Sequence, residues 1–135
     1  MWLLFYFSID INGYFDKIPE VAYDMMELSD KPLTLVLDGA KNMATNLIAE
    51  DGTVGVRVTS EEFSKTLCAR FKRPIVSTSA NISGEATPAI FAEITEEIVG
   101  AVDYVVGYRQ DDNSRNKPSS IIRLASNGNV KIIRE

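Results

Sequence analysis

The sequence predicts an α/β fold: a twisted sheet of mixed parallel and antiparallel strands with flanking helices. Short apolar runs, which are typical of strands, alternate with segments whose apolar residues recur at helical spacing. Near the C-terminus, Asn127-Gly128 separates two further apolar runs and indicates a hairpin of antiparallel strands. The chain has 135 residues, of which 45% are apolar and 24% charged, so we interpret residues 1–135 as a single globular domain.

The first predicted elements are two strands and a helix between them. Residues 2–7 and 33–37 are continuous apolar runs, as expected of strands covered on both faces, although periodicity alone leaves a helix open at 2–7. Residues 18–28 predict a helix, because Pro19 suits a first turn and apolar residues recur on one face. The predicted inner face of this helix consists of Val21, Met25 and Leu28.

A third strand is predicted at Thr53–Val58 from its clean alternation. The valines at its even-numbered positions point to one face, while Gly55 and Arg57 point to the other. Because glycine has no side chain, we expect bare surface beside Arg57, where a ligand could approach the guanidinium closely. The alternative is an ordinary surface arginine on an exposed strand face.

A second helix is predicted next, because Thr59 and Glu62 match a capping box. Cys68 lies on this helix and is expected to be buried packing. The predicted inner face of the helix consists of Phe63, Leu67 and Phe71. A strand at residues 74–76 is expected to follow.

The last third of the chain predicts one more helix and three strands. Thr87-Pro88 matches an N-cap followed by proline at the first helical position. The inner face predicted for this helix consists of Ile90, Ile94 and Ile98. Residues 103–106 predict a strand, 107–118 a polar loop, and 120–124 and 130–133 the two strands of the hairpin.

The composition excludes several kinds of site. Histidine is absent, which removes Ser-His and Cys-His nucleophile pairs and imidazole metal ligands. The single cysteine excludes an internal disulfide and a cysteine-rich zinc site, and we expect Asp111 and Asp112 to be solvated, so we predict no protein metal site. No apolar run approaches the ~20 residues of a membrane span, and no basic residue precedes the run at 2–7, so we expect a cytoplasmic protein.

Charge is distributed unevenly along the chain. The net charge is −5, yet residues 104–135 hold six cations against three acidic side chains, a local net charge of +3. A basic segment on an acidic chain is consistent with a local anionic partner. It is equally consistent with a solvated loop followed by exposed strand faces.

The segment Ser77–Gly84 is rich in hydrogen-bonding groups. Four hydroxyls and one carboxamide occur between Ser77 and Ser83, directly after an apolar strand pattern. These groups and the backbone N–H groups of the loop could bind a charged or polyhydroxylated ligand. The alternative is a strand-end turn in which serine and asparagine side chains satisfy their own backbone.

Three ordered motifs form a recognisable combination. They are residues 72–84, Lys-Arg-Pro-Ile-Val-Ser-Thr-Ser-Ala-Asn-Ile-Ser-Gly, residues 55–58, Gly-Val-Arg-Val, and residues 117–122, Lys-Pro-Ser-Ser-Ile-Ile. The first resembles the signature, with its Ser-x-Asn, of the YrdC/YciO family, which comprises L-threonylcarbamoyl-AMP synthases and their relatives. The second resembles the Gly-x-Arg strand of that family, and the third its Pro-Ser-Thr-Ile/Val segment, with serine at the threonine position.

Two further segments agree with this resemblance, which extends from about residue 19 to the end. Residues 30–34, Asp-Lys-Pro-Leu-Thr, resemble the family segment Pro-Gly-Pro-x-Thr. Residues 132–134, Ile-Ile-Arg, resemble a late strand that ends in arginine.

The resemblance implies a twisted α/β fold with a basic cavity for ATP, L-threonine and bicarbonate. Family members form L-threonylcarbamoyl-AMP and release pyrophosphate, and the product supplies a tRNA modification with the help of partner proteins. Mg²⁺ would arrive with ATP. Because adenylation needs positioning and electrostatic stabilisation rather than a covalent intermediate, no catalytic residue is assigned. A second interpretation follows the family's older description as double-stranded-RNA-binding translation factors: a nucleotide- or RNA-binding module without turnover.

By position in these motifs, the resemblance implies ATP and substrate binding at Arg57, Ser77, Ser79, Asn81, Ser119, Ser120 and Arg134. Arg57 would hold a carboxylate or a phosphate bidentately. Ser79 and Asn81 would donate to phosphate oxygens, and Arg134 would contact the nucleotide.

The chain departs from the family pattern at its start. Full-length members begin with a Tyr-Pro-Thr-Asp/Glu-Thr turn, a helix and a Lys-x-Arg motif, and none of these is present. Residues 1–5 resemble the strand after Lys-x-Arg, so we interpret the chain as a family domain that is incomplete at its N-terminus. A mis-assigned start codon, a truncated gene and a short paralogue stay open. We also expect exposed apolar surface around Trp2–Phe7 to favour self-association or a marginal fold.

Overall fold

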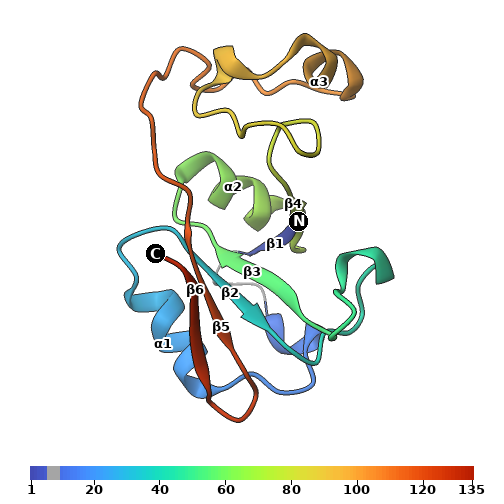
Figure 1. Ribbon diagram of the computed structural model, residues 1–135, viewed down its shortest axis with the longest axis vertical. Coiled ribbons are helices and arrows are strands. Elements are labelled where there is room, and N and C mark those ends of the chain that lie inside the picture. Colours follow the sequence, from blue (N-terminus) through green and yellow to red (C-terminus); the bar gives the residue numbers. More distant parts are fainter. Residues whose placement is uncertain (6–9) are drawn as a thin grey trace. The chain divides into compact units, whose positions relative to one another are not determined.

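A computed structural model describes residues 1–5 and 10–135 of the chain (Figure 1). The chain divides into two compact units. The first comprises Met1–Ser77 and Ser119–Glu135, and the second comprises Thr78–Pro118. The sheet belongs to the first unit, which contains the apolar core.

The first unit is built on a six-stranded sheet with the strand order β4-β1-β3-β2-β5-β6. Its strands are β1 (Trp2–Phe5), β2 (Leu33–Leu37), β3 (Val54–Val58), β4 (Ile75–Ser77), β5 (Ser120–Leu124) and β6 (Val130–Arg134). The β1–β3 and β2–β5 pairs are parallel, whereas β1–β4, β2–β3 and β5–β6 are antiparallel. The predicted mixed sheet is therefore confirmed.

The core joins one face of this sheet to helix α1 (Glu20–Leu28), which contributes buried Ala22 and Met26. The buried strand residues of this core are Leu3, Phe5, Leu35, Leu37, Val54, Val56 and Leu124. The helix agrees with the sequence prediction, and Met25 of its predicted inner face packs against the core, but the prediction is wrong at Val21, which is 41% exposed, and at Leu28, which is 81% exposed. Ala22 lets the helix approach the sheet closely, and Met26 follows it one turn later on the same face.

Helix α2 (Glu62–Phe71) begins with a different cap from the predicted one. The Glu61 carboxylate accepts the N–H groups of Phe63 at 3.1 Å and Ser64 at 2.8 Å. Thr59 is buried, and its N–H donates to the Phe5 carbonyl at 2.9 Å, so it still extends the pairing of β3 with β1. The capping box predicted from Thr59 is therefore not formed, because the chain leaves the sheet only after this residue.

The inner face of α2 is centred on Cys68. Its side chain is fully buried, as predicted, and its thiol lies 3.8 Å from the Leu4 carbonyl of β1. Leu67 and Phe71, by contrast, are 46% and 57% exposed, so the predicted inner face is wrong at both positions. The helix contacts the sheet chiefly at β1, and five of its ten residues are exposed.

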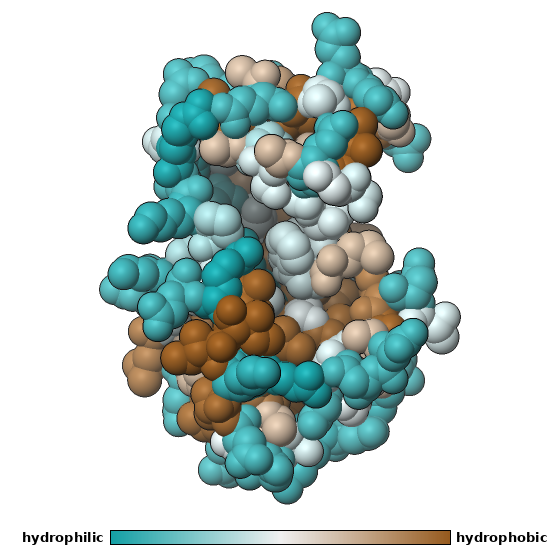
Figure 2. Space-filling view, viewed as in Figure 1, coloured by the Kyte–Doolittle hydropathy of each residue, from teal (hydrophilic) through white to brown (hydrophobic). Residues whose placement is uncertain are grey.

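The N-terminal strand is not an edge of the sheet. β1 is paired with β4 on one side and with β3 on the other, so the edge strands are β4 and β6. The exposed apolar surface predicted around Trp2–Phe7 is therefore not a strand edge at Trp2–Phe5, and Tyr6 and Phe7 lie outside the described residues. Exposed apolar side chains gather instead on β6, where Figure 2 shows apolar surface over the β5–β6 hairpin.

The C-terminal hairpin is confirmed. The N–H of Ala125 donates to the Asn129 carbonyl at 2.9 Å and closes the turn. Gly128 adopts a φ of 89°, in the left-handed region that glycine occupies without steric cost.

The second unit contains little regular structure. Its helical segments are a 3₁₀ turn, η3 (Phe91–Glu93), and the short helix α3 (Glu96–Ala101). The helix predicted from Thr87-Pro88 is wrong, because Ile90 is extended and the Glu93 carboxylate reaches back to the Ala89 N–H at 2.9 Å. Residues 103–106 form no strand, since no described segment pairs with them.

The other helical segments are also short. They are the 3₁₀ turns η1 (Ile11–Tyr14) and η2 (Thr45–Leu47). Within residues 1–5 and 10–135, no helix is both long enough and apolar enough to cross a membrane.

Candidate functional site

One row of residues across the sheet carries two of the predicted binding residues. The strand register places Arg57 opposite Thr34, Thr34 opposite Ile121, and Ile121 opposite Arg134. Residues directly opposite one another project from the same face of a sheet, and this face is the one away from Val56 and the core. Three strand spacings separate the backbones of Arg57 and Arg134, about 14 Å.

A β-bulge brings Arg134 onto this face. Ile122 lies opposite Ile132, but the next pair is Ile121 with Arg134, so Ile133 is an extra residue. Without the bulge, strict alternation would place Arg134 on the same face as Ile132, toward the core side. Sequence reasoning did not anticipate this bulge, because its position depends on how β6 pairs with β5.

Thr34 and Ser119 form a buried polar pair between the two arginines. Thr34 is 6% exposed and Ser119 is 9% exposed, and their hydroxyl oxygens are 2.8 Å apart. The Ser119 carbonyl accepts two hydrogen bonds from Arg134, at 3.0 Å from Nε and 2.7 Å from Nη2. Thr34 is the residue that sequence reasoning missed. The sequence feature that could have identified Thr34 is its hydroxyl inside the apolar strand Leu33–Leu37, because a buried hydroxyl needs a hydrogen-bond partner.

Arg57 is half-buried and lies against a cavity of about 230 Å³. Burial lowers the pKa of its guanidinium, because the charged form is partly desolvated. In the part of the chain that the structure describes, no hydrogen bond or ion pair to its side chain is found. Arg57 is therefore a partly dehydrated cation without a partner among the described residues, which suits an anionic ligand.

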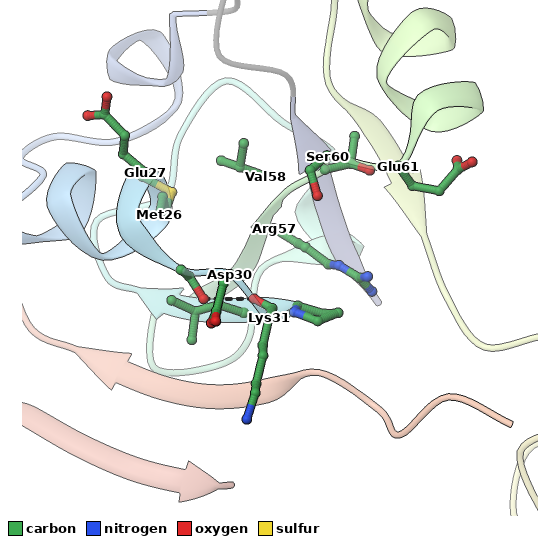
Figure 3. Close-up of a pocket in the computed structure, with 12 residues that line it drawn as sticks. Met26, Glu27, Asp30, Lys31, Arg57, Val58, Ser60 and Glu61 are labelled. Atoms are coloured by element: carbon green, nitrogen blue, oxygen red, sulfur yellow. Dashed lines mark hydrogen bonds between the residues drawn. The ribbon is translucent and has the colours of Figure 1, made fainter. Parts of the chain in front are cut away.

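The cavity lies between the C-terminal end of α1, the start of β2 and the end of β3 (Figure 3). Figure 3 shows Arg57 between the Asp30-Lys31 turn and the Ser60-Glu61 segment. Ser29 fixes the turn by donating from its hydroxyl to the Lys31 carbonyl at 2.7 Å. The lining residues are Met26, Glu27, Ser29, Asp30, Lys31, Pro32, Leu33, Arg57, Val58, Thr59, Ser60 and Glu61.

Gly55 has a different role from the predicted one. A Cβ at this position would lie 3.2 Å from the Trp2 Cβ and 3.4 Å from the Thr34 Cγ2. The surface beside Arg57 is therefore not bare, because Trp2 and Thr34 fill the space that the glycine leaves. Gly55 allows these two side chains to pack closely against β3.

The remaining predicted residues are divided between the two units. In the first unit, Ser77 ends β4 opposite Trp2, on the same face as Gly55 and Arg57. Ser120 follows Ser119 and alternates to the core face, so it is outside the row of Arg57 and Arg134. Ser79 and Asn81 belong to the second unit.

Asn81 shapes its own loop. Its Nδ2 donates to the carbonyls of Ile82 at 3.0 Å and Glu85 at 3.1 Å. Its Oδ1 is buried, and no donor to it is present among the described residues. The turn interpretation thus accounts for the amide nitrogen, whose two hydrogen bonds both stay within the loop.

No metal ligand set accompanies these residues. Residues 1–5 and 10–135 contain no group of three or more cysteine, aspartate and glutamate side chains that could hold a metal ion. The cations and hydroxyls of the row suit an anionic ligand.

Comparisons with known proteins identify the family of the chain. A family model for Sua5, YciO and YrdC proteins, which carries the description "Telomere recombination", matches residues 3–135. The chain belongs to this family. The resemblance inferred from the motifs is therefore confirmed, and the match contains every predicted binding residue.

Curated relatives of this chain include proteins named threonylcarbamoyl-AMP synthase. The protein from Pseudoalteromonas translucida is 35% identical over 115 residues, which cover 84% of this chain and 60% of that protein. The protein from Idiomarina loihiensis is 31% identical over 96 residues, which cover 71% of this chain and 50% of that protein. The chain thus spans roughly half to three-fifths of the length of these relatives.

A solved structure confirms the fold. The solution structure of the MTH1692 protein from Methanobacterium thermoautotrophicum matches with a TM-score of 0.60 and 27% identity. The match covers 98% of this chain and 61% of that one.

Proposed function

We propose that the chain binds ATP and L-threonine for the synthesis of L-threonylcarbamoyl-AMP. Arg57 carries the proposal: a half-buried guanidinium without a partner in the described chain lines a cavity on a family motif. The names of the curated relatives support the same reaction. The proposed substrates are ATP, L-threonine and bicarbonate, and the proposed products are L-threonylcarbamoyl-AMP, pyrophosphate and water.

The proposed reaction has two bond-forming steps. The threonine amine attacks bicarbonate, and loss of water gives a carbamate. A carbamate oxygen then attacks the α-phosphorus of ATP, and the bond to the pyrophosphate leaving group breaks. Both steps bring anions together, so cationic and hydrogen-bonding groups that hold them in line supply the main stabilisation. Mg²⁺ would enter with the ATP phosphates.

The proposed roles of the residues follow from their placement. Arg57 binds a carboxylate or phosphate in the cavity, because a guanidinium pairs with both bidentately. Arg134 contributes its remaining N–H groups to the nucleotide. Ser77 supplies a hydroxyl on the same face, whereas the Ser119 hydroxyl is already paired with Thr34 and Ser119 contributes through its carbonyl contact with Arg134. Binding by Ser79, Asn81 and Ser120 is proposed from the motifs alone. The product would then serve tRNA modification by partner proteins in the cytoplasm.

The test is threonine-dependent release of pyrophosphate from ATP in the presence of bicarbonate and Mg²⁺. We expect release by the wild-type chain and loss of release when EDTA removes Mg²⁺. Arg57→Gln should lower kcat/KM about a hundredfold, because two charge-assisted hydrogen bonds worth about 1.5 kcal/mol each are lost. Arg70→Gln makes the same change of charge on exposed α2 and should leave the rate unchanged.

The outcomes separate the interpretations. Pyrophosphate release that survives Arg57→Gln would contradict the assigned role of Arg57. ATP binding without any release would replace the proposed enzyme by a nucleotide-binding module. Absence of both activities would refute the proposal for this chain.

A further inference from the structure

The buried hydroxyl of Thr34 has no role in the proposed chemistry. It lies inside the apolar strand β2 and is 6% exposed. Burying a hydroxyl costs free energy unless it forms a hydrogen bond, and its observed partner is the Ser119 hydroxyl at 2.8 Å. A valine of nearly the same shape would avoid this cost, so the pair is not explained by packing.

Ser119 joins Thr34 to Arg134. Two contacts fix Ser119: its hydroxyl meets Thr34, and the N–H of the next residue, Ser120, donates to the Pro32 carbonyl at 3.1 Å. The Ser119 carbonyl then receives both Nε and Nη2 of Arg134. Thr34 of β2 contacts Ser119, and Ser119 in turn contacts Arg134 of β6. The direction of the Arg134 guanidinium therefore depends on β2.

The bulge acts on the Arg134 side chain, and so does the pair of hydrogen bonds from Arg134 to the Ser119 carbonyl, which we call the clamp. The extra residue Ile133 turns Arg134 to the face of Arg57, and the Ser119 carbonyl then holds its guanidinium by one edge. No other partner of the Arg134 guanidinium is found among the described residues, so its Nη1 edge is available to a ligand. A guanidinium held in this way loses less side-chain entropy when it binds an anion.

We propose that Thr34 is a positioning residue that aims Arg134, through Ser119, at the nucleotide. The identity of the ligand rests on the proposed function, whereas the clamp on Arg134 does not. Thr34 belongs to the segment at residues 30–34 that resembled the family pattern but received no role.

The first measurement follows Arg134 without any ligand. In the ¹⁵N-labelled chain, exchange of the Arg134 Nε–H with water reports its hydrogen bond to Ser119. Thr34→Val should raise this exchange about tenfold, and Thr34→Ser should restore it. Thr53→Val is the matched control, because Thr53 is also buried and its hydroxyl donates to Asp51 at 2.7 Å, away from Arg134.

The second measurement is ATP affinity by calorimetry. Thr34→Val should weaken ATP binding about fivefold, in line with the loss of one hydrogen bond. Thr34→Ser should bind as the wild type does. In an Arg134→Gln background, Thr34→Val should have no further effect, because the residue it positions is gone.

Each outcome decides the inference. Unchanged Nε–H exchange in Thr34→Val would overturn it, and so would increased exchange with unaltered ATP affinity. A wild-type chain that binds no ATP would refute the proposed function, while the exchange measurement would still decide whether Thr34 holds Arg134. If Thr34→Val does not fold, Ser119→Ala removes the other hydroxyl and the same exchange comparison applies.

Discussion

At the scale of single residues, the polar face of the sheet is costly to fold. The Arg57 guanidinium is partly desolvated without a partner in the described chain, and two hydroxyls are buried at Thr34 and Ser119. Buried charges and hydroxyls stabilise a protein less than apolar side chains of the same volume would. Stability therefore does not explain them, whereas the proposed anionic ligand would replace the lost hydration of Arg57.

Close packing explains why residue 55 is a glycine. Gly55→Ala would place a methyl group 3.2 Å from the Trp2 Cβ and 3.4 Å from the Thr34 Cγ2. We expect a loss of about 1–3 kcal/mol in the free energy of unfolding, as for overpacked cores, measured by urea denaturation. Gly13→Ala is the control, since its added Cβ would meet nothing within 4 Å. Equal stability of Gly55→Ala and the wild type would show that Trp2 moves aside.

The lowered pKa of the Asp112 carboxyl predicts an acid-sensitive contact in the second unit. Its pKa is lowered to about 2, first by the N–H and hydroxyl of Ser114 and then by the Arg109 guanidinium. A lowered pKa means that the contacts stabilise the loop fully above the ordinary value of 3.8 and are lost as the pH falls through about 2. We expect the ¹³C signal of the Asp112 carboxyl to titrate near pH 2 and Ser114→Ala to raise the midpoint. A wild-type midpoint at the ordinary value would contradict these contacts.

At the scale of elements, local patterns predicted the strands better than the helix faces. Alternation in Thr53–Val58 placed the valines inward and Arg57 outward correctly, because one buried face fixes strand register. Helix faces are set by the partner: α1 docks through Ala22 rather than Val21, which shifts its inner face by one position. The bulge at Ile133 also depends on a partner, because it exists only in the pairing of β6 with β5, so the sequence of β6 alone did not predict it.

The start of α2 tests the difference between a sequence motif and the observed cap. Glu61→Ala removes the carboxylate that accepts the Phe63 and Ser64 N–H groups. We expect a loss of about 1 kcal/mol in the free energy of unfolding. The predicted capping box instead made the Thr59 hydroxyl the cap and the Glu62 carboxylate its reciprocal partner, so Glu62→Ala is the matched comparison and should cost little. A larger loss in Glu62→Ala than in Glu61→Ala, measured by urea denaturation, would favour the capping box.

At the scale of the whole molecule, the two units differ in how they are stabilised. Every buried residue that the structure describes lies in the first unit, and residues 78–118 contribute none. The second unit is also where sequence prediction failed most, at the helix from Thr87-Pro88 and the strand at 103–106. Secondary-structure propensity decides little where no core selects among the alternatives. The fold of the first unit and its row of binding residues were thus more predictable than the second unit, except for contacts made across strands, such as Thr34 with Ser119.

This difference predicts the pattern of amide hydrogen exchange. Without a buried core, residues 78–118 should open with little free energy and exchange faster than the amides of β1 to β3. Asn81→Ala should speed exchange in 77–84 further in the free chain, because two hydrogen bonds to the Ile82 and Glu85 carbonyls are lost. Exchange of both units at one rate would contradict the assignment of the core to the first unit.

Adding Mg²⁺-ATP then separates the two interpretations of the Ser77–Gly84 loop. If its hydroxyls and amides bind phosphate, ATP should slow exchange of these amides, and Ser79→Ala should reduce that slowing without altering the free loop. The α3 amides, at residues 96–101, serve as the control and should not respond. If the loop is only a turn, ATP leaves its exchange unchanged while still binding to the chain. That outcome would restrict the nucleotide to the face of the sheet that carries Arg57 and Arg134.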